Sequence, residues 1–374
     1  MKLKSLILIA IFGTALSCSS NPYSIPIVDV NNIKNSIRLE LSGLLNDIEV
    51  IELETTQYNL IGYRHHSLVF AYISNTSIVI HTERAIDQFD RQGRYIRRLT
   101  EKGNGPNEFR NVVFCFVDEE TDILYYEDSR DRQKICRIDL SSGQFLEPLQ
   151  TDLDTKRFDV WYYKNNHIYG FPTAKGGGFD ATDPDSLVIA SHFNLTAGSM
   201  NNLYGSHKYT IKPLGKSMVG YKNHISLFNM HYSDTIYQLH NNALEARFFV
   251  KMKNKMINHR RGGDELFLLF EYEKGIILLR NSIIYKRVSE GSEGITYYPE
   301  QYMLLNPIGG LKNIEQFFIN PLDIAITPPT MSEKGSTIDN DVISYPFPKL
   351  SGSYGYYLID QEQGNPHIIL GKIK

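Results

Sequence analysis

Short runs of alternating apolar and polar residues, separated by glycine turns, recur along most of the chain. The clearest unit starts at residues 86–90 (IDQFD), turns at Gly93 and returns over residues 94–99. A period of two is typical of β-strands with one buried face, and glycine supplies the positive φ that a tight turn needs. The loop at residues 103–106 (GNGP) ends the unit, because it favours neither helix nor strand. The pattern therefore predicts antiparallel hairpins.

Weaker copies of this unit follow at intervals of roughly 40 to 55 residues, the range of four-stranded propeller blades. The predicted strands are 78–80, 86–89 and 94–99 in the first unit; 112–117, 124–126, 135–138 and 144–149 in the second; 159–163, 168–170, 186–193 and 209–211 in the third; 218–221, 225–228, 235–239 and 245–250 in the fourth; 266–271, 275–279, 282–288 and 296–298 in the fifth; and 314–318, 354–359 and 367–370 in the last. We expect residues 173–184 and 320–352 to form long loops on a ring face, where recognition commonly resides.

One alternating segment, residues 49–54 (EVIELE), belongs to none of these units, and the last unit is one strand short. If the early segment completes the last sheet, the ring closes and no sheet edge stays exposed. The sequence therefore predicts an all-β fold. We expect a single six-bladed β-propeller of four-stranded antiparallel blades over residues 45–374, closed by an N-terminal strand in the last blade.

The first 17 residues have the features of a signal peptide. Two lysines precede a short apolar run at residues 6–12, which is too short to span a bilayer. Residues 15–18 (ALSC) resemble the bacterial lipobox, whose cysteine is lipidated, so we expect Cys18 to carry a lipid anchor. An ordinary cleaved signal and an uncleaved anchor are the alternatives. Residues 18–44 would then be a tether and lead-in, and the protein would be held at the outer membrane, on its periplasmic face or at the cell surface.

The charge balance narrows the choice of partners. The formal net charge is -3, so the chain lacks the basic field that nucleic-acid-binding proteins carry, and we expect no nucleic acid partner. Tyrosine is abundant, at 24 residues, which suits half-buried strands and also surfaces that contact carbohydrate or peptide. We expect a monomer whose partners are the membrane and a glycan, peptide or envelope protein.

Two cysteines remain beyond Cys18. Cys115 and Cys136 fall on the predicted first and third strands of the second blade. A strand between them would hold their backbones beyond the roughly 7 Å that a disulfide can bridge. We therefore predict two buried free thiols in preference to a disulfide. Their spacing does not fit a metal site.

Several segments together resemble the six-bladed β-propeller lipoproteins of Bacteroides and relatives, whose repeats are similar to NHL repeats. The matching segments are the lipobox, residues 51–56 (IELETT), 89–93 (FDRQG), 103–109 (GNGPNEF) and 233–237 (SDTIY), and the ending at 365–374. The resemblance covers the mature chain and implies its fold and location. Because that family is largely without assigned activity, the resemblance implies no chemistry.

Four charged or titratable residues are candidate ligand contacts. His65 and His66 precede the first blade, and adjacent residues on a strand point to opposite faces, so one of them could reach the central channel. Arg260 and Arg261 lie in a charged loop ahead of the fifth blade, which could bind an acidic ligand on a ring face. A structural or solvent-exposed role is the alternative for each of the four.

An aromatic pair and a glycine loop complete the candidates. Trp161 and Tyr163 share one face of a predicted strand and could stack on sugar rings, although packing between blades is the ordinary role of such residues. The loop at residues 103–109 could cradle an anion with backbone N–H groups. The alternative is a connection between blades in which Glu108 bonds nearby backbone.

The sequence reveals neither a reaction nor a ligand. Enzymes with six-bladed rings bind a divalent metal in the channel through Glu, Asn, Asp or His side chains. In this chain the carboxylates are scattered, and no nucleophile elbow, zinc-protease pair or Cys-x-x-Cys motif occurs. We therefore expect a non-enzymatic binding or scaffold lipoprotein without a cofactor. The alternative is a metal-dependent hydrolase or lyase of the lactonase-like type.

Overall fold

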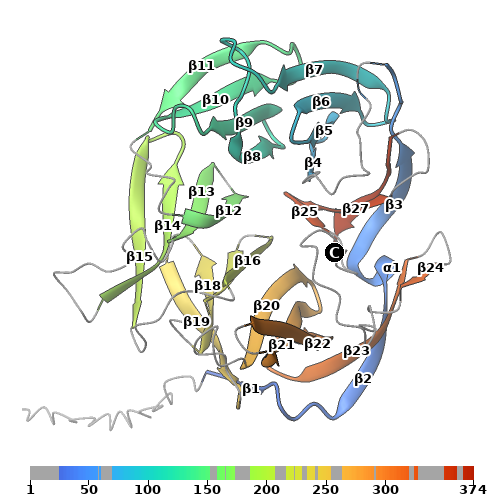
Figure 1. Ribbon diagram of the computed structural model, residues 1–374, viewed down its shortest axis with the longest axis vertical. Coiled ribbons are helices and arrows are strands. Elements are labelled where there is room, and N and C mark those ends of the chain that lie inside the picture. The colour runs from blue at the N-terminus through green and yellow to red at the C-terminus, as the bar shows by residue number, and fades with distance from the viewer. Residues whose placement is uncertain are drawn as a thin grey trace, which may run out of the picture.

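The chain forms a ring of six small β-sheets (Figure 1). A computed structural model describes residues 25–57, 59, 70–151, 158–164, 166–172, 186–206, 216–222, 224–229, 234–240, 243–253, 263–289, 292–319, 324–326, 349–359 and 365–374. Strands dominate these residues, and the one described helix is α1 (Leu41–Leu44). None of the described segments forms a helix long and apolar enough to cross a membrane. The predicted all-β, six-bladed β-propeller is confirmed.

Each blade is an antiparallel sheet whose first strand lies nearest the centre of the ring (Figure 1). The first three blades are β4 (Phe70–Ile73), β5 (Ser77–His81), β6 (Ala85–Asp90) and β7 (Tyr95–Glu101); β8 (Val112–Asp118), β9 (Ile123–Asp128), β10 (Lys134–Asp139) and β11 (Phe145–Gln150); and β12 (Phe158–Lys164), β13 (His167–Pro172), β14 (Ser186–Asn194) and β15 (Ser199–Ser206). The fourth blade is β16 (Lys216–Tyr221), β17 (His224–Asn229), β18 (Thr235–His240) and β19 (Ala243–Lys251). The fifth is β20 (Gly263–Tyr272), β21 (Gly275–Ser289), β22 (Ser292–Leu305) and β23 (Leu311–Ile319), with β24 (Ile324–Ile326) beside β23. The sixth is β25 (Lys349–Ser351), β26 (Tyr354–Ile359), β27 (His367–Ile373) and β3 (Leu45–Glu52).

The two ends of the chain close the ring. Strand β3 pairs antiparallel with β27, with Ile51 opposite Ile368 and Glu52 opposite His367. The predicted closure by an N-terminal strand is thus confirmed. Pairing with β3 covers the edge that β27 would otherwise leave open.

The segment before β3, expected to be a lead-in, also carries strands. Strand β1 (Ile27–Asp29) pairs in parallel with β19, and β2 (Asn35–Glu40) pairs in parallel with β23. The N-terminal segment therefore lines the outer edges of three consecutive blades. Neither strand was predicted, because β1 is too short for its alternation to stand out and most side chains of β2 are polar.

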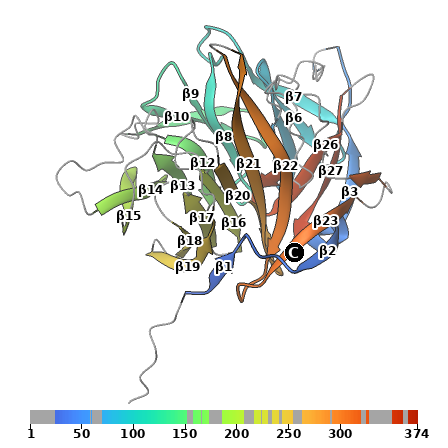
Figure 2. The same cartoon turned by 60° about the horizontal axis from the view of Figure 1, so that its bottom comes forward.

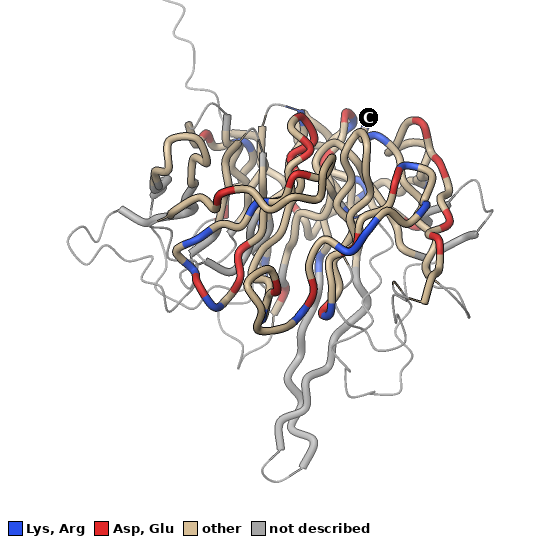
Figure 3. Tube along the Cα trace, turned by 90° about the horizontal axis from the view of Figure 1, so that it is seen from above, with Lys and Arg blue, Asp and Glu red and all other residues tan. Residues whose placement is uncertain are grey.

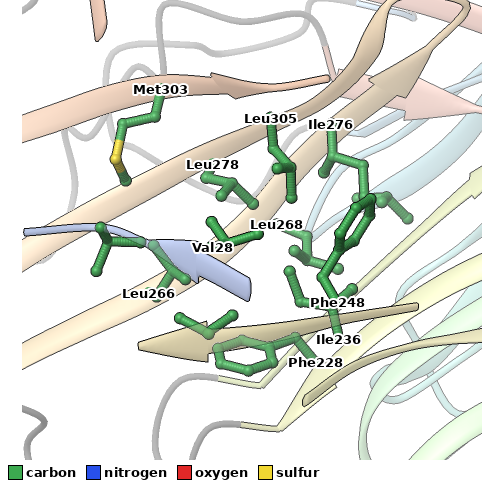
Figure 4. Close-up of a cluster of buried hydrophobic side chains, with 13 residues drawn as sticks. Val28, Phe228, Ile236, Phe248, Leu266, Leu268, Ile276, Leu278, Met303 and Leu305 are labelled. Carbon is green, nitrogen blue, oxygen red and sulfur yellow. The ribbon is translucent and has the colours of Figure 1, made fainter. Parts of the chain in front are cut away.

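Strand β1 also contributes to the core. Val28 is buried among apolar side chains of the fourth and fifth blades, with Phe248 and Leu266 among its neighbours (Figure 4). Burial alternates along this strand, since Val28 and Val30 are each 1% exposed whereas Ile27 is 66% exposed. The N-terminal strand is therefore packed onto the body with one face outward.

The predictions for the last two blades were partly wrong. Strand β21 runs unbroken from Gly275 to Ser289 and pairs with β22 along its length (Figure 2), where two strands were predicted. Segment 314–318, assigned to the last blade, lies in β23 of the fifth. The innermost strand of the sixth blade, β25, falls in the predicted loop 320–352. In β22 the pairing register shifts beside Pro299, which lacks the N–H of a regular strand, and the predicted segment 296–298 ends just before this residue.

Two further predicted segments can be compared with the structure. The fourth strand of the third blade is β15, whereas the segment predicted for it, 209–211, lies outside the described residues. Loop 103–109 joins the first two blades, with the Gly105 N–H donating to Glu108 Oε2 at 2.6 Å. Its predicted role as a connection is confirmed.

The prediction of two free thiols in preference to a disulfide is confirmed. Cys115 and Cys136 are free thiols on β8 and β10, and both lie opposite Tyr126 of the intervening strand β9. Each is half-buried rather than fully buried. Burial raises the pKa of the Cys115 thiol.

Candidate functional site

The turns that follow the innermost strands meet on one face of the ring. Each innermost strand runs in the same direction, so these turns surround the mouth of the central channel; Figure 3 shows the ring from the side, with charged residues spread over its rim. Hydrogen bonds join turns of different blades: the Asn75 side chain donates to the Glu119 carbonyl at 3.4 Å, and the Glu273 N–H donates to the C-terminal Lys374 carbonyl at 3.0 Å. These bonds tie neighbouring blades together at the opening.

A cavity of about 620 Å³ occupies this mouth. Its walls come from the second, third, fourth and sixth blades and combine aromatic, acidic and small residues. The lining residues are Val117, Asp118, Glu119, Glu120, Tyr162, Tyr163, Asn166, Gly220, Tyr221, Lys222, Gly352, Ser353 and Ile373. The volume lies within the range of small-molecule sites, and the lining is more polar than in most of them.

The second blade supplies an acidic wall. Asp118 ends β8, and its carboxylate accepts the Glu120 backbone N–H at 3.0 Å, which fixes the turn. This is the backbone role that Asp in a turn is expected to play. The same carboxylate lies beside the hydroxyl of Tyr163. Burial is the largest cause that raises the pKa of Tyr163, and the negative charge of Asp118 raises it further. The hydroxyl of Tyr163 therefore stays protonated and can donate hydrogen bonds at neutral pH.

A contact across the mouth fixes the position of Glu119. Its two carboxylate oxygens accept the backbone N–H and the hydroxyl of Ser353, each at 2.6 Å. The first blade separates these residues in the ring, so the contact joins the second blade to the sixth. Gly352 has a φ of +55°, and a side chain there would overlap the Glu119 carboxylate. Burial raises the pKa of Glu119, and the hydrogen bonds from Ser353 oppose the rise.

Tyrosines form the adjoining wall. Tyr163 stacks on Phe116 with ring centroids 4.0 Å apart and planes 11° apart, so a rigid layer of aromatic rings lies behind it. The hydroxyl of Tyr162 fills the space that a side chain at Gly220 would need. Tyr221 lies under the ammonium of Lys222, which is 5.0 Å from its ring centroid. The aromatic wall is therefore packed in place by the blades themselves.

A buried ionic group lies behind this wall. His224 is 5.9 Å from Tyr221 between ring centroids, and its Nε2 is 2.9 Å from the Glu271 carboxylate. Arg247 donates to the same carboxylate and to the hydroxyl of Ser226. Burial acts to raise the pKa of Glu271, but the hydrogen bond from His224 and the charge of Arg247 outweigh it, so the pKa lies below its usual value. The group joins the fourth and fifth blades and supports the wall from the side away from the cavity.

Of the side chains predicted to contact a ligand, the structure describes that of Tyr163 and not the others. Tyr163 lines the cavity, and its role in ligand binding stays a prediction. Trp161 lies in β12 opposite Gly170, and its side chain is outside the described part of the chain. Outside it too lie His65, His66, Arg260, Arg261 and Cys18.

Most of the cavity lining was not singled out from the sequence. Asp118 is one of the scattered carboxylates that no spacing singles out, and the turns at Lys222 and Gly352 carry no motif. A usable signal was present: each turn directly follows the first strand of a blade, so its residues must reach the channel mouth once the blades close into a ring. Among the described residues, no group of three or more His, Cys, Asp or Glu side chains lies close enough together to hold a metal ion.

Comparisons with known proteins find solved structures that are similar to this chain. A presumed exported protein of Bacteroides fragilis is 12% identical, with a TM-score of 0.53 over 93% of this chain and 99% of its own. A member of the DUF4221 family from Bacteroides vulgatus is 10% identical, with a TM-score of 0.48 over 88% of this chain and 97% of its own. No curated protein matches the sequence. The family described as "Domain of unknown function (DUF4934)" matches residues 24–298, so the chain belongs to this family.

Proposed function

We propose that the protein is a non-enzymatic binding protein of the cell envelope, anchored through a lipid on Cys18, that holds a glycan at the mouth of its channel. The observation that carries the proposal is the cavity of about 620 Å³, whose lining combines tyrosines with acidic and amide side chains. The faces of tyrosine rings suit the C–H surfaces of sugars. Carboxylates and amides such as those of Asp118 and Asn166 accept and donate the hydrogen bonds that sugar hydroxyls make.

The rigidity of the site supports binding as its role. Tyr163 is stacked on Phe116, and Glu119 is held by Ser353 from another blade, so these side chains need little ordering when a ligand arrives. Binding loses less free energy when the contact groups are already fixed. A preorganised mouth on a rigid ring suits the capture of one ligand shape.

A glycan-binding assay tests the proposal. The mature chain is screened against oligosaccharides, and the affinity for any hit is measured by calorimetry. Asp118→Asn and Tyr163→Phe keep the volume of the wall, and each should raise the Kd by about tenfold, because each removes a hydrogen-bonding group that the site presents. Asp131→Asn is the matched control, an exposed acid of the same blade outside the cavity lining, and should leave the Kd unchanged.

Two results would contradict the proposal. Glycan binding that neither wall variant weakens would place the site elsewhere. Binding of a peptide with no glycan hit would assign the mouth to another ligand class. The lipid anchor has its own test: the mature N-terminus should carry acyl mass on Cys18, and Cys18→Ser should release the protein from the membrane fraction.

The hydrolase alternative makes a different demand on the channel. It requires three or four Asp, Glu, Asn or His side chains within about 2.5 Å of one point. Among the described residues, no group of three or more His, Cys, Asp or Glu side chains meets this demand. No observation on the described residues favours this alternative over ligand binding.

A further inference from the structure

Exposed apolar side chains gather at one place on the rim of the ring. Six large apolar side chains are exposed among the described residues, and four of them lie together. The four, which we call the rim patch, are Ile25 (39% exposed), Ile27 (66%), Phe249 (37%) and Ile308 (85%). Single exposed apolar residues are ordinary on a protein surface, but a contiguous group of them marks an interaction site.

Backbone contacts bring the members of the rim patch together from three distant segments. Ile27 of β1 lies opposite Phe249 of β19 in a parallel pair, so both side chains stand on the same face of the sheet. The Phe249 N–H donates to the Pro26 carbonyl at 2.9 Å. Pro26 also lies against the turn between β22 and β23, because a side chain at Gly309 would be 3.0 Å from its Cβ. Ile308 precedes that glycine.

The outward side of the N-terminal segment is not part of the core. Val28 and Val30 bury the other side in the core, whereas Ile25 and Ile27 are exposed. The exposed apolar side chains are therefore available for a partner.

We propose that the rim patch rests on the lipid bilayer to which the N-terminus is tethered. The inference relies on the lipid anchor proposed above. Ile25 follows Cys18 by seven positions, a segment that reaches about 25 Å at full extension. An acyl chain on Cys18 would thus hold Ile25 of the rim patch within this distance of the membrane.

Basic side chains beside the rim patch fit the same partner. Lys253 and Lys312 are exposed, and Lys251 is 60% exposed at the end of β19. Lys251 pairs with Asp29 at 3.2 Å, but an ion pair this exposed contributes little to stability and leaves the ammonium free to meet a lipid phosphate. Apolar side chains flanked by lysines are typical of surfaces that lie on a membrane.

Docking through the rim patch orients the channel. The turn between β22 and β23 lies on the same face as the turns around the cavity, because strands of a blade alternate in direction. The mouth of the channel would therefore open on the membrane-facing side of the ring. A ligand attached to the membrane surface could then reach the mouth directly.

Fluorescence quenching by lipid measures the contact. Ile308→Cys is labelled with a bimane dye in the acylated mature chain, which is reconstituted into phosphatidylethanolamine–phosphatidylglycerol vesicles that contain brominated acyl chains. Ile96→Cys is the control, because Ile96 is 40% exposed on β7 in the first blade, across the ring from β1. The unsubstituted chain gives the background from Cys115 and Cys136. We expect strong quenching at position 308 and none at position 96. Equal quenching at both, or none at 308, overturns the proposal.

Partitioning of the unacylated chain into vesicles separates membrane docking by the rim patch from lipid anchoring at Cys18. In the Cys18→Ser chain, Ile27→Ser and Ile308→Ser should each lower the vesicle partition coefficient by about tenfold, while Ile96→Ser should not change it. If the natural chain proves not to be acylated while these two substitutions still lower the partition coefficient, only the lipid-anchor proposal is refuted. A dimer in sedimentation that Ile308→Ser dissociates would assign the patch to a second copy and overturn membrane docking.

Discussion

Replacement of Gly93 by alanine tests how the first blade is held against the closing strand. Gly93 has a φ of +84° in the turn between β6 and β7. A Cβ there would overlap the backbone carbonyl oxygen of Glu52 in β3 and lie 2.8 Å from Cγ2 of Ile51. The Gly93 carbonyl also accepts the Glu54 N–H at 2.8 Å. The glycine is thus required both by its own backbone and by the strand beside it.

The cost of Gly93→Ala has two separable parts. A side chain in the left-handed region costs about 1–2 kcal/mol. The displaced β3 backbone adds the loss of the Glu54 hydrogen bond, worth about 1 kcal/mol, and of packing around Ile51. We expect the free energy of unfolding to fall by about 2–4 kcal/mol in all.

Gly198→Ala is the matched control for this prediction. Gly198 has a φ of +63° in a turn of the third blade, and a Cβ there would meet no atom within 4 Å. Its replacement should cost only the backbone part. Urea unfolding of both variants gives the two free energies, and hydrogen exchange of β3 should rise in Gly93→Ala alone. Equal losses in the two variants would refute the argument that Gly93 abuts the closing strand.

Buried groups give three more expected outcomes. Burial lowers the pKa of His81 to about 4. The stability that neutral His81 contributes above pH 6.5 should therefore be lost, by about 3 kcal/mol, as the pH falls to 4. In acid unfolding, His81→Phe should remove this dependence of stability on pH. Glu108→Ala leaves the Gly105 N–H without its acceptor and should cost about 1–3 kcal/mol in thermal unfolding. Iodoacetamide should modify Cys115 far more slowly than Cys136, and oxidation should not join the two, as read by mass spectrometry.

The architecture was predictable because it rests on a repeated local pattern. Alternating residues and glycine turns mark most strands of the first four blades, and the surplus segment at 49–54 indicated the closure that β3 makes with β27. Two of the failures share a cause. Strand β25 has three residues and β1 has three, so pairing with neighbours rather than their own pattern makes them strands.

The candidate site was harder to predict than the fold. Of the residues singled out for ligand contact, Tyr163 lines the cavity, whereas Asp118 and Tyr221 were not foreseen there. The cavity is assembled from turns of four blades that are far apart in sequence, and no local spacing relates them. That these turns share one face of the ring is known only once the direction in which each innermost strand runs is known.

A disulfide across the ring closure tests the central claim most directly. The double variant Glu52→Cys, His367→Cys places thiols on directly opposite residues of β3 and β27, whose Cα atoms in an antiparallel pair are about 4.5–5.5 Å apart and within bridging range. Glu52→Cys with Lys372→Cys is the control, with the second thiol further along β27, opposite Asn46 rather than Glu52. The account predicts that mild oxidation joins positions 52 and 367, as identified by peptide mass, and forms no bridge in the control. Absence of the bridge, or equal bridging in the control, would contradict a ring closed by its own ends.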